Sequence, residues 1–200
     1  DTKIINNGYL MVELFFVISG FVIFSAYSNR INSRNDLIKF QFLRFARLYP
    51  VHLIFLLLFL SIEILRYITT IHYGAQILKV APFSTNSIQA FIEQAFLLQS
   101  VLPNGNATTY NAPAWSLSVE FYTYLIFALI LLLSKHNKIK AMFALACISI
   151  SLLIFKSTFG MENLLRCFAG FFLGCLIANY ANHTKIILPK YISLAIFLLL

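Results

Sequence analysis

Long runs of apolar residues, separated by short polar stretches, dominate this sequence. Five runs approach or reach the roughly 20 residues that an α-helix needs to cross the hydrocarbon core of a bilayer. These runs cover residues 8–28, 48–65, 115–134, 139–155 and 164–180. A sixth run begins near Ile187 and continues to the last residue. The pattern predicts an all-α, polytopic bundle with about five to six transmembrane helices.

The segment between the second and third runs has a different character. Its apolar piece, residues 88–102, is too short to cross a bilayer and includes Glu93, Gln94 and Gln99. We expect an interfacial or re-entrant helix there. A turn-rich stretch at 103–106 and then Pro113 separate this piece from the third long run.

Composition supports a membrane protein and excludes several other classes. Hydrophobic residues make up 60% of the chain and charged residues 11%, and the mean hydropathy is +0.82. These values exclude a soluble, a disulfide-stapled or a nucleic-acid-binding module. The three cysteines lie inside apolar runs without the spacing of metal ligands, so we expect them to pack and expect no metal ion.

The distribution of basic residues predicts the orientation in the bilayer. Ten of the 15 Lys and Arg residues lie in the connections that follow the first, third and fifth runs. The positive-inside rule therefore places residue 1 outside and the basic connection at 30–47 in the cytoplasm. The chain begins with Asp1 and ends inside an apolar run, so we interpret residues 1–200 as part of one membrane domain.

Three glutamates interrupt the apolar runs, where a charge must face a cavity or a partner. Glu63 precedes Arg66 by three residues, which predicts an ion pair on one helix face. Glu13 lies in the first two turns of its run, where a structural position at the interface and a functional role are equally compatible. Glu120 is the strongest candidate of the three.

Glu120 belongs to a polar stripe on a helix that is otherwise apolar. Ser116, Glu120 and Tyr124 recur at intervals of four residues, so they share one helix face that favours water or substrate. Trp115 stands at interfacial depth. The alternative is that Trp115 and Tyr124 are belt or packing aromatics and that Glu120 is a hydrogen-bonded structural group.

Two further motifs stand near the membrane boundary or inside an apolar run. Arg44 and Arg47 lie three residues apart, and a pair of guanidinium groups suits phosphate oxygens, although juxtamembrane arginines also contact anionic lipid. Ser19 and Gly20 are small residues among aromatic ones, which favours close helix packing or exposure of the backbone to a ligand. The GxxxG spacing of Gly170 and Gly174 predicts helix packing.

In order, the segments 12–21, 44–50 and 115–120 read VELFFVISGF, RFARLYP and WSLSVE. Together they resemble the acyltransferase 3 family of integral membrane acyltransferases, whose bacterial members O-acetylate surface polysaccharides. The resemblance implies a bundle of about ten helices, and hence family helices before and after this chain. It also implies a bacterial inner-membrane location, with acyl-CoA, acetyl-CoA above all, as co-substrate and a hydroxyl of a cell-surface carbohydrate or related molecule as acceptor.

The resemblance also implies roles for individual residues. The family's catalytic histidine lies on a helix upstream of these segments, and none of the four histidines here corresponds to it. Arg44 and Arg47 would bind the CoA phosphates, and Glu120 would orient the histidine or bind acceptor hydroxyls. The channel or substrate site would be lined by Glu13, Ser19, Gly20, Trp115, Ser116 and Tyr124.

The sequence departs from the family pattern at two places. Leu43 stands where many members have another arginine, and Phe121, Tyr122 and Thr123 replace a more polar run. Because of both departures, the resemblance does not identify the acceptor molecule. The alternative functions are a transporter or flippase that uses the intramembrane glutamates, and a sensory or scaffold bundle. No bound cofactor is expected for the acyltransferase.

Overall fold

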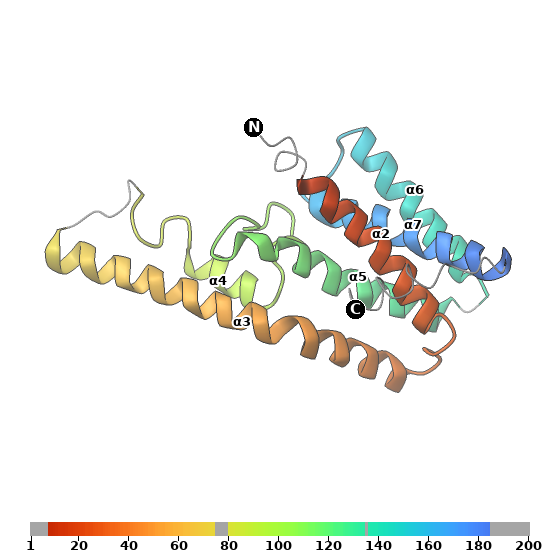
Figure 1. Ribbon diagram of the computed structural model, residues 1–200. Coiled ribbons are helices and arrows are strands. Elements are labelled where there is room, and N and C mark those ends of the chain that lie inside the picture. Colours follow the sequence, from red (N-terminus) through yellow and green to blue (C-terminus); the bar gives the residue numbers. More distant parts are fainter. Residues whose placement is uncertain (1–7, 75–79, 135, 185–200) are drawn as a thin grey trace. The chain divides into compact units, whose positions relative to one another are not determined.

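The computed structural model describes residues 8–74, 80–134 and 136–184. Within this part every regular element is a helix, which confirms the all-α class (Figure 1). The α-helices are α2 (Gly8–Tyr27), α3 (Arg34–Tyr73), α4 (Ile88–Ala95), α5 (Trp115–Leu133), α6 (Lys138–Ile154) and α7 (Glu162–Thr184). A short 3₁₀-helix, η1 (Ala112–Ala114), leads directly into α5.

Four of these helices are long and apolar enough to span a membrane. The candidate spans are Leu10–Tyr27, Arg34–His72, Ala112–Leu133 and Glu162–Thr184. Helix α6 has 17 residues, the lower end of the spanning range. The apolar run from Ile187 lies outside the described residues. The chain is thus an integral membrane protein, with four candidate spans in the described part.

Helix α3 differs most from the prediction. We expected a connection at 30–47 and a helix at 48–65, and this was wrong, because one helix of 40 residues covers both. It begins with a capping box, in which Ser33 N–H donates to Asp36 Oδ2 (2.9 Å) and Asp36 N–H donates to Ser33 Oγ (3.2 Å). The helix then continues through Pro50, whose missing N–H removes one backbone hydrogen bond.

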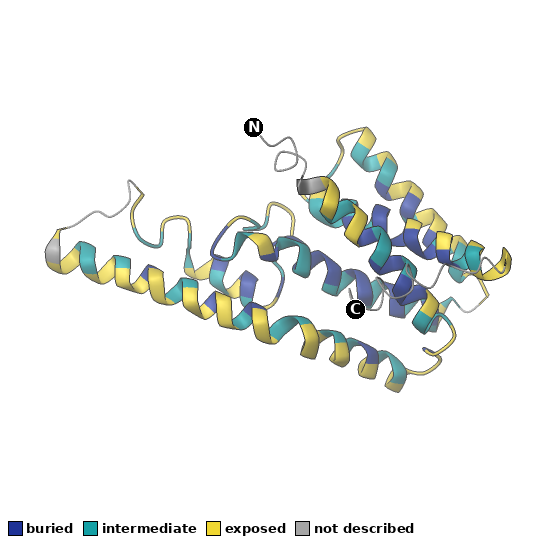
Figure 2. Ribbon diagram, viewed as in Figure 1, coloured by how far each residue is buried: buried dark blue, intermediate teal, exposed yellow. Residues whose placement is uncertain are grey.

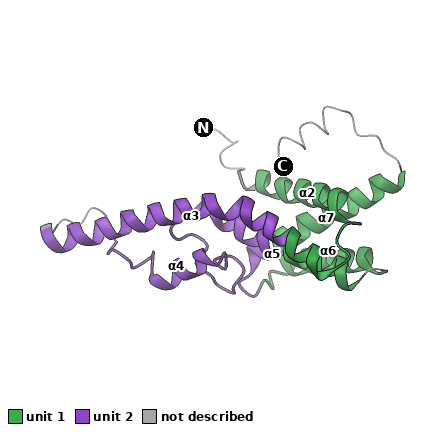
Figure 3. Ribbon diagram, turned by 90° about the horizontal axis from the view of Figure 1, so that it is seen from below, with its two compact units in different colours: residues 1–40, 123–158, 165–200 green, residues 41–122, 159–164 purple. Residues whose placement is uncertain are grey.

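The helices form two compact units (Figure 3). Unit 1 comprises residues 1–40, 123–158 and 165–200, and unit 2 comprises residues 41–122 and 159–164. Each unit has its own packing and is described by itself.

Close contact between α2 and α7 holds unit 1 together. A Cβ on Gly20 would collide with the Phe171 carbonyl, and a Cβ on Gly174 would collide with the Val17 carbonyl. The backbones therefore touch at both glycines. A Cβ on Gly170 would lie 3.0 Å from Phe16 Cβ, so Gly170 and Gly174 both pack against α2, which confirms the predicted GxxxG packing. Beside this contact lies a buried aromatic core whose rings meet edge to face or tilted, formed by Phe40, Tyr124, Phe127, Phe171 and Phe172.

In unit 2, helix α4 has its polar face inside. Glu93 and Gln94 are buried, whereas Ile88, Ile92 and Phe96 form an exposed apolar face (Figure 2). This arrangement would be unfavourable in water and is favourable against lipid, which agrees with the expected interfacial or re-entrant segment. The helix ends at Ala95, earlier than the predicted 102, and Leu97 takes a left-handed conformation (φ 56°).

Side chains of α3 and α5 bind the backbone where α4 ends. Four consecutive carbonyls, those of residues 94–97, each accept one hydrogen bond from such a side chain. The donors, in the order of these carbonyls, are His52 Nε2 (2.9 Å), Tyr49 OH (3.0 Å), Tyr122 OH (3.0 Å) and Ser118 Oγ (2.6 Å). The carbonyls that a helix end leaves unpaired are thereby satisfied away from water.

Two carboxylates organise the loops around α4. Glu63 accepts from Arg66 (2.8 Å), which confirms the predicted pair, and also from Phe83 N–H (2.7 Å). Glu93 accepts from Gln89 Nε2 (2.9 Å) and from both the N–H (3.0 Å) and the side-chain amide (2.9 Å) of Asn106. Burial raises the pKa of Glu93, but these hydrogen bonds outweigh burial and leave that pKa below its usual 4.5.

The contact at Gly174 predicts a large effect of added volume. Gly174→Leu should destabilise unit 1 by about 3 kcal/mol or more, because the new side chain must displace the α2 backbone. Thermal unfolding in detergent, followed by size-exclusion chromatography, measures the shift in Tm. The matched control is Ala144→Leu at an exposed position of α6, which should leave Tm nearly unchanged. Equal Tm values for both variants would contradict the close contact.

Glu93 predicts a dependence of local stability on pH. Because its pKa is lower in the folded state, its stabilising effect is complete above about pH 4.5 and is lost as the pH falls through the folded-state pKa. The hydrogen-exchange protection factors of residues 104–109, corrected for the intrinsic exchange rate at each pH, should therefore fall as the pH drops below 4.5. Glu93→Gln should give lower protection factors already at pH 7, with little further change on acidification. A wild-type profile in that variant would show that Glu93 does not hold the loop.

Candidate active site

Glu120 lies in the first part of α5, which the 3₁₀-turn containing Pro113 introduces. Its side chain is almost fully buried, with 2% of the residue exposed. A carboxylate at such a position keeps its charge only where neighbouring groups compensate for lost water. The burial agrees with the prediction that Glu120 faces the protein interior, and its catalytic role stays a prediction.

The other members of the stripe differ in how far they are buried and in what they contact. Ser116 is half-buried and its hydroxyl lies 3.4 Å from the Pro113 carbonyl, one turn back. Trp115, also half-buried, is the first residue of α5. Tyr124 is buried, and its hydroxyl forms a 2.8 Å hydrogen bond with Ser19 Oγ of α2. The structure thus brings together two predicted site residues that are 105 positions apart in the sequence.

The two arginines lie on α3 rather than on a loop. Arg44 is half-buried and Arg47 is exposed. Arg44 therefore lies near the packed face of α3, whereas Arg47 is accessible from outside the protein. Gln41, one turn earlier, donates from Nε2 to the Phe121 carbonyl (3.1 Å). Phe45 stacks on Tyr49 with ring centroids 4.3 Å apart. These contacts fix the part of α3 that carries both guanidinium groups.

Structural contacts account for the positions of Glu13 and Gly20. Glu13 Oε1 pairs with Arg166 Nε of α7 at 2.5 Å. Gly20 packs against the α7 backbone, and its carbonyl accepts a hydrogen bond from Cys175 Sγ (3.4 Å). The packing alternative therefore explains both residues, whereas their lining of a substrate channel stays a prediction.

Sequence reasoning named Gln94 and Gln99 but did not predict that they and His52 are buried together in unit 2. His52 is 1% exposed, and Gln94 and Gln99 are fully buried. Tyr49 and His52 stand three residues apart on α3, a spacing that places them on one face. This spacing indicates that both side chains contact the same neighbouring segment. Nothing in the sequence identifies that segment as the end of α4.

The predicted site residues divide between the two units. Unit 1 contains Glu13, Ser19, Gly20 and Tyr124, and unit 2 contains Arg44, Arg47, Trp115, Ser116 and Glu120. Within unit 1 the structure joins Ser19 to Tyr124. Within unit 2 the stripe and the arginines occupy α5 and α3. Among the residues that the structure describes, no group of three His, Cys, Asp or Glu side chains could hold a metal ion.

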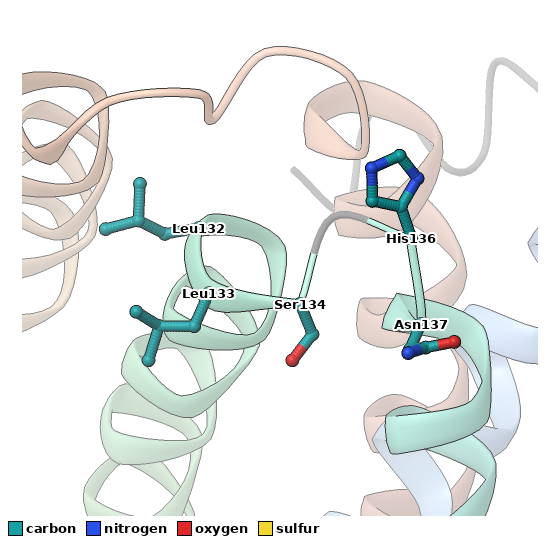
Figure 4. A pocket seen from close by; sticks show the side chains of 5 residues that line it. All are labelled: Leu132, Leu133, Ser134, His136 and Asn137. Carbon is teal, nitrogen blue, oxygen red and sulfur yellow. The ribbon is translucent and has the colours of Figure 1, made fainter.

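A cavity of about 390 Å³ lies at the turn between α5 and α6 (Figure 4). It is lined by Leu132, Leu133, Ser134, His136 and Asn137. None of the predicted site residues lines this cavity. It therefore adds nothing to the candidate site.

The sequence was compared with known proteins. A family model described as "Acyltransferase domain" matches residues 2–200. Acyltransferase MdmB of Streptomyces mycarofaciens is 33% identical over 126 residues, which cover 61% of this chain and 28% of that protein. The matched part is therefore less than a third of that relative's length. No solved structure matches the chain. Since the family model covers nearly all of the sequence, the chain belongs to the acyltransferase 3 family.

Proposed function

We propose that this chain is the part of a membrane acyltransferase that moves an acyl group, acetyl above all, from acyl-CoA to a hydroxyl of a cell-surface carbohydrate or related acceptor. Family membership supports the acyltransferase reaction. The observation within the chain that carries the proposal is the burial of Glu120 on α5, at 2% exposure. An ionisable group buried in an apolar helix is costly and therefore points to function.

The reaction defines what the protein must supply. The acceptor oxygen forms a bond to the acyl carbon, the bond from that carbon to sulfur breaks, and CoA leaves as its thiol. This requires a base for the hydroxyl proton, stabilisation of the oxyanion and alignment of both substrates. On the family resemblance the base is a histidine upstream of residue 1. Glu120 then orients that imidazole, or accepts hydrogen bonds from acceptor hydroxyls.

The arginines of α3 suit the other substrate. CoA carries several phosphate groups, and each guanidinium offers a planar fork of donors to phosphate oxygens. Arg44 and Arg47 lie within one turn of α3. On the predicted orientation this part of α3 lies on the cytoplasmic side, where acyl-CoA is made. Contact with anionic lipid is the competing role for both residues.

Family membership favours the enzyme over the transporter alternative. A transporter would move its substrate across sealed vesicles without acyl-CoA, whereas the enzyme must incorporate the acyl group into an acceptor. Membranes that contain the full-length protein should therefore transfer label from acetyl-labelled acetyl-CoA into envelope material. Uptake without any such incorporation would contradict the proposal.

Replacing Glu120 tests its catalytic role. Glu120→Gln keeps the side-chain shape and removes the charge. It should lower acetyl transfer by about 10²–10⁴-fold, because it disturbs the alignment of the general base with the acceptor hydroxyl, and general-base catalysis contributes a factor of that size. Labelled acetyl incorporation measures the loss, and the amount of folded protein in the membrane is measured in parallel. The matched control is Glu162→Gln at an exposed position of α7, which should keep full activity. Full activity of Glu120→Gln would remove Glu120 from the site.

The arginine pair has a separate test. Arg44→Ala combined with Arg47→Ala should raise KM for acetyl-CoA by about tenfold or more, because charge-assisted hydrogen bonds to phosphate are lost. The value of kcat should change much less. Arg34→Ala, at the exposed start of the same helix, provides the control for lost positive charge. If the double variant has an unchanged KM, lipid contact is the role of both arginines.

A further inference from the structure

The end of α4 and the turn that follows it contain buried side-chain acceptors that have no donor among the described residues. Gln94 Nε2 donates to the Thr109 carbonyl (2.7 Å), and Gln99 Nε2 donates to the Ala114 carbonyl (3.2 Å). Because a carbonyl can only accept, these two contacts fix the orientation of both amides. Each amide nitrogen thereby donates one hydrogen bond, and each side-chain oxygen is left as an acceptor.

The hydrogen bond of His52 to a carbonyl likewise fixes which ring nitrogen is the donor. Its Nε2 lies 2.9 Å from the Gln94 carbonyl, so Nε2 must carry the proton. In the neutral ring Nδ1 is then an acceptor. Within the described residues no group donates to His52 Nδ1, Gln94 Oε1 or Gln99 Oε1. All three side chains are at least 99% buried and belong to unit 2.

Hydrogen bonds connect these groups to one short stretch of chain. His52 binds the backbone of Gln94, and Ser118 Oγ binds the Leu97 carbonyl (2.6 Å) and accepts from Ser100 N–H (3.3 Å). Ser100 Oγ is also buried and has no partner in the described part. Residues 94–100 therefore concentrate unsatisfied polar atoms at the end of α4, whereas buried polar atoms in proteins are nearly always hydrogen-bonded.

We propose that His52 Nδ1, Gln94 Oε1 and Gln99 Oε1 bind buried water in unit 2. Water fits because it donates two hydrogen bonds and is the smallest molecule that can do so. The acceptors are two amide oxygens and one imidazole nitrogen, and no group of three His, Cys, Asp or Glu side chains accompanies them in the described residues that could hold a metal ion. The site would complete the hydrogen bonding of an irregular backbone segment inside the bundle. This inference is independent of the proposed function.

Radiolytic footprinting tests the proposal in the full-length protein in lipid nanodiscs. Short X-ray pulses generate hydroxyl radicals from water in place, and mass spectrometry locates oxidised side chains. Met142 provides the internal control, because it is fully buried in α6 and its sulfur oxidises readily. We expect His52 to be oxidised about tenfold faster than Met142 because water lies next to the imidazole. If both residues remain at background, no water is bound at His52.

Discussion

The absence of water from the bilayer interior is the constraint on which this structure depends. Irregular backbone can lie between membrane helices only where the protein satisfies its polar groups. The end of α4 meets this condition, because Tyr49, His52, Ser118 and Tyr122 each donate a hydrogen bond to one of four consecutive carbonyls. The same constraint explains why α4 buries its polar face and exposes its apolar one.

This constraint separates two kinds of polar residue on α5. Ser118 and Tyr122 face the end of α4 and are part of the fold. Glu120 points roughly 160–200° away from both around the helix axis, so the carbonyl network does not use it. Ser118 and Tyr122 are therefore explained by the fold, whereas Glu120 remains a candidate for the site. The opposite face of α5 carries Ser116, Glu120 and Tyr124. Tyr124 forms the hydrogen bond with Ser19.

The sequence predicted the elements that depend on local pattern and missed those that depend on tertiary contacts. The apolar runs placed α2, α5, α6 and α7 within a few residues of their observed ends. The first third of α3 was missed because its polar residues do not belong to an apolar run and the capping signal of Ser33 and Asp36 was not used. The pairing of Glu13 with Arg166 could not be predicted, since 153 positions separate the two residues and no local rule connects them.

The Ser19–Gly20 motif shows why a family segment can be recognised without its roles being assigned. Adjacent residues on a helix point about 100° apart. Gly20 therefore meets the α7 backbone, while Ser19 reaches the hydroxyl of Tyr124 on α5. One residue sets how closely two helices approach, and its neighbour forms a polar contact that this approach keeps in place. A substitution at Gly20 would displace Ser19 as well, so loss of activity there would not distinguish a channel-lining role from a packing role.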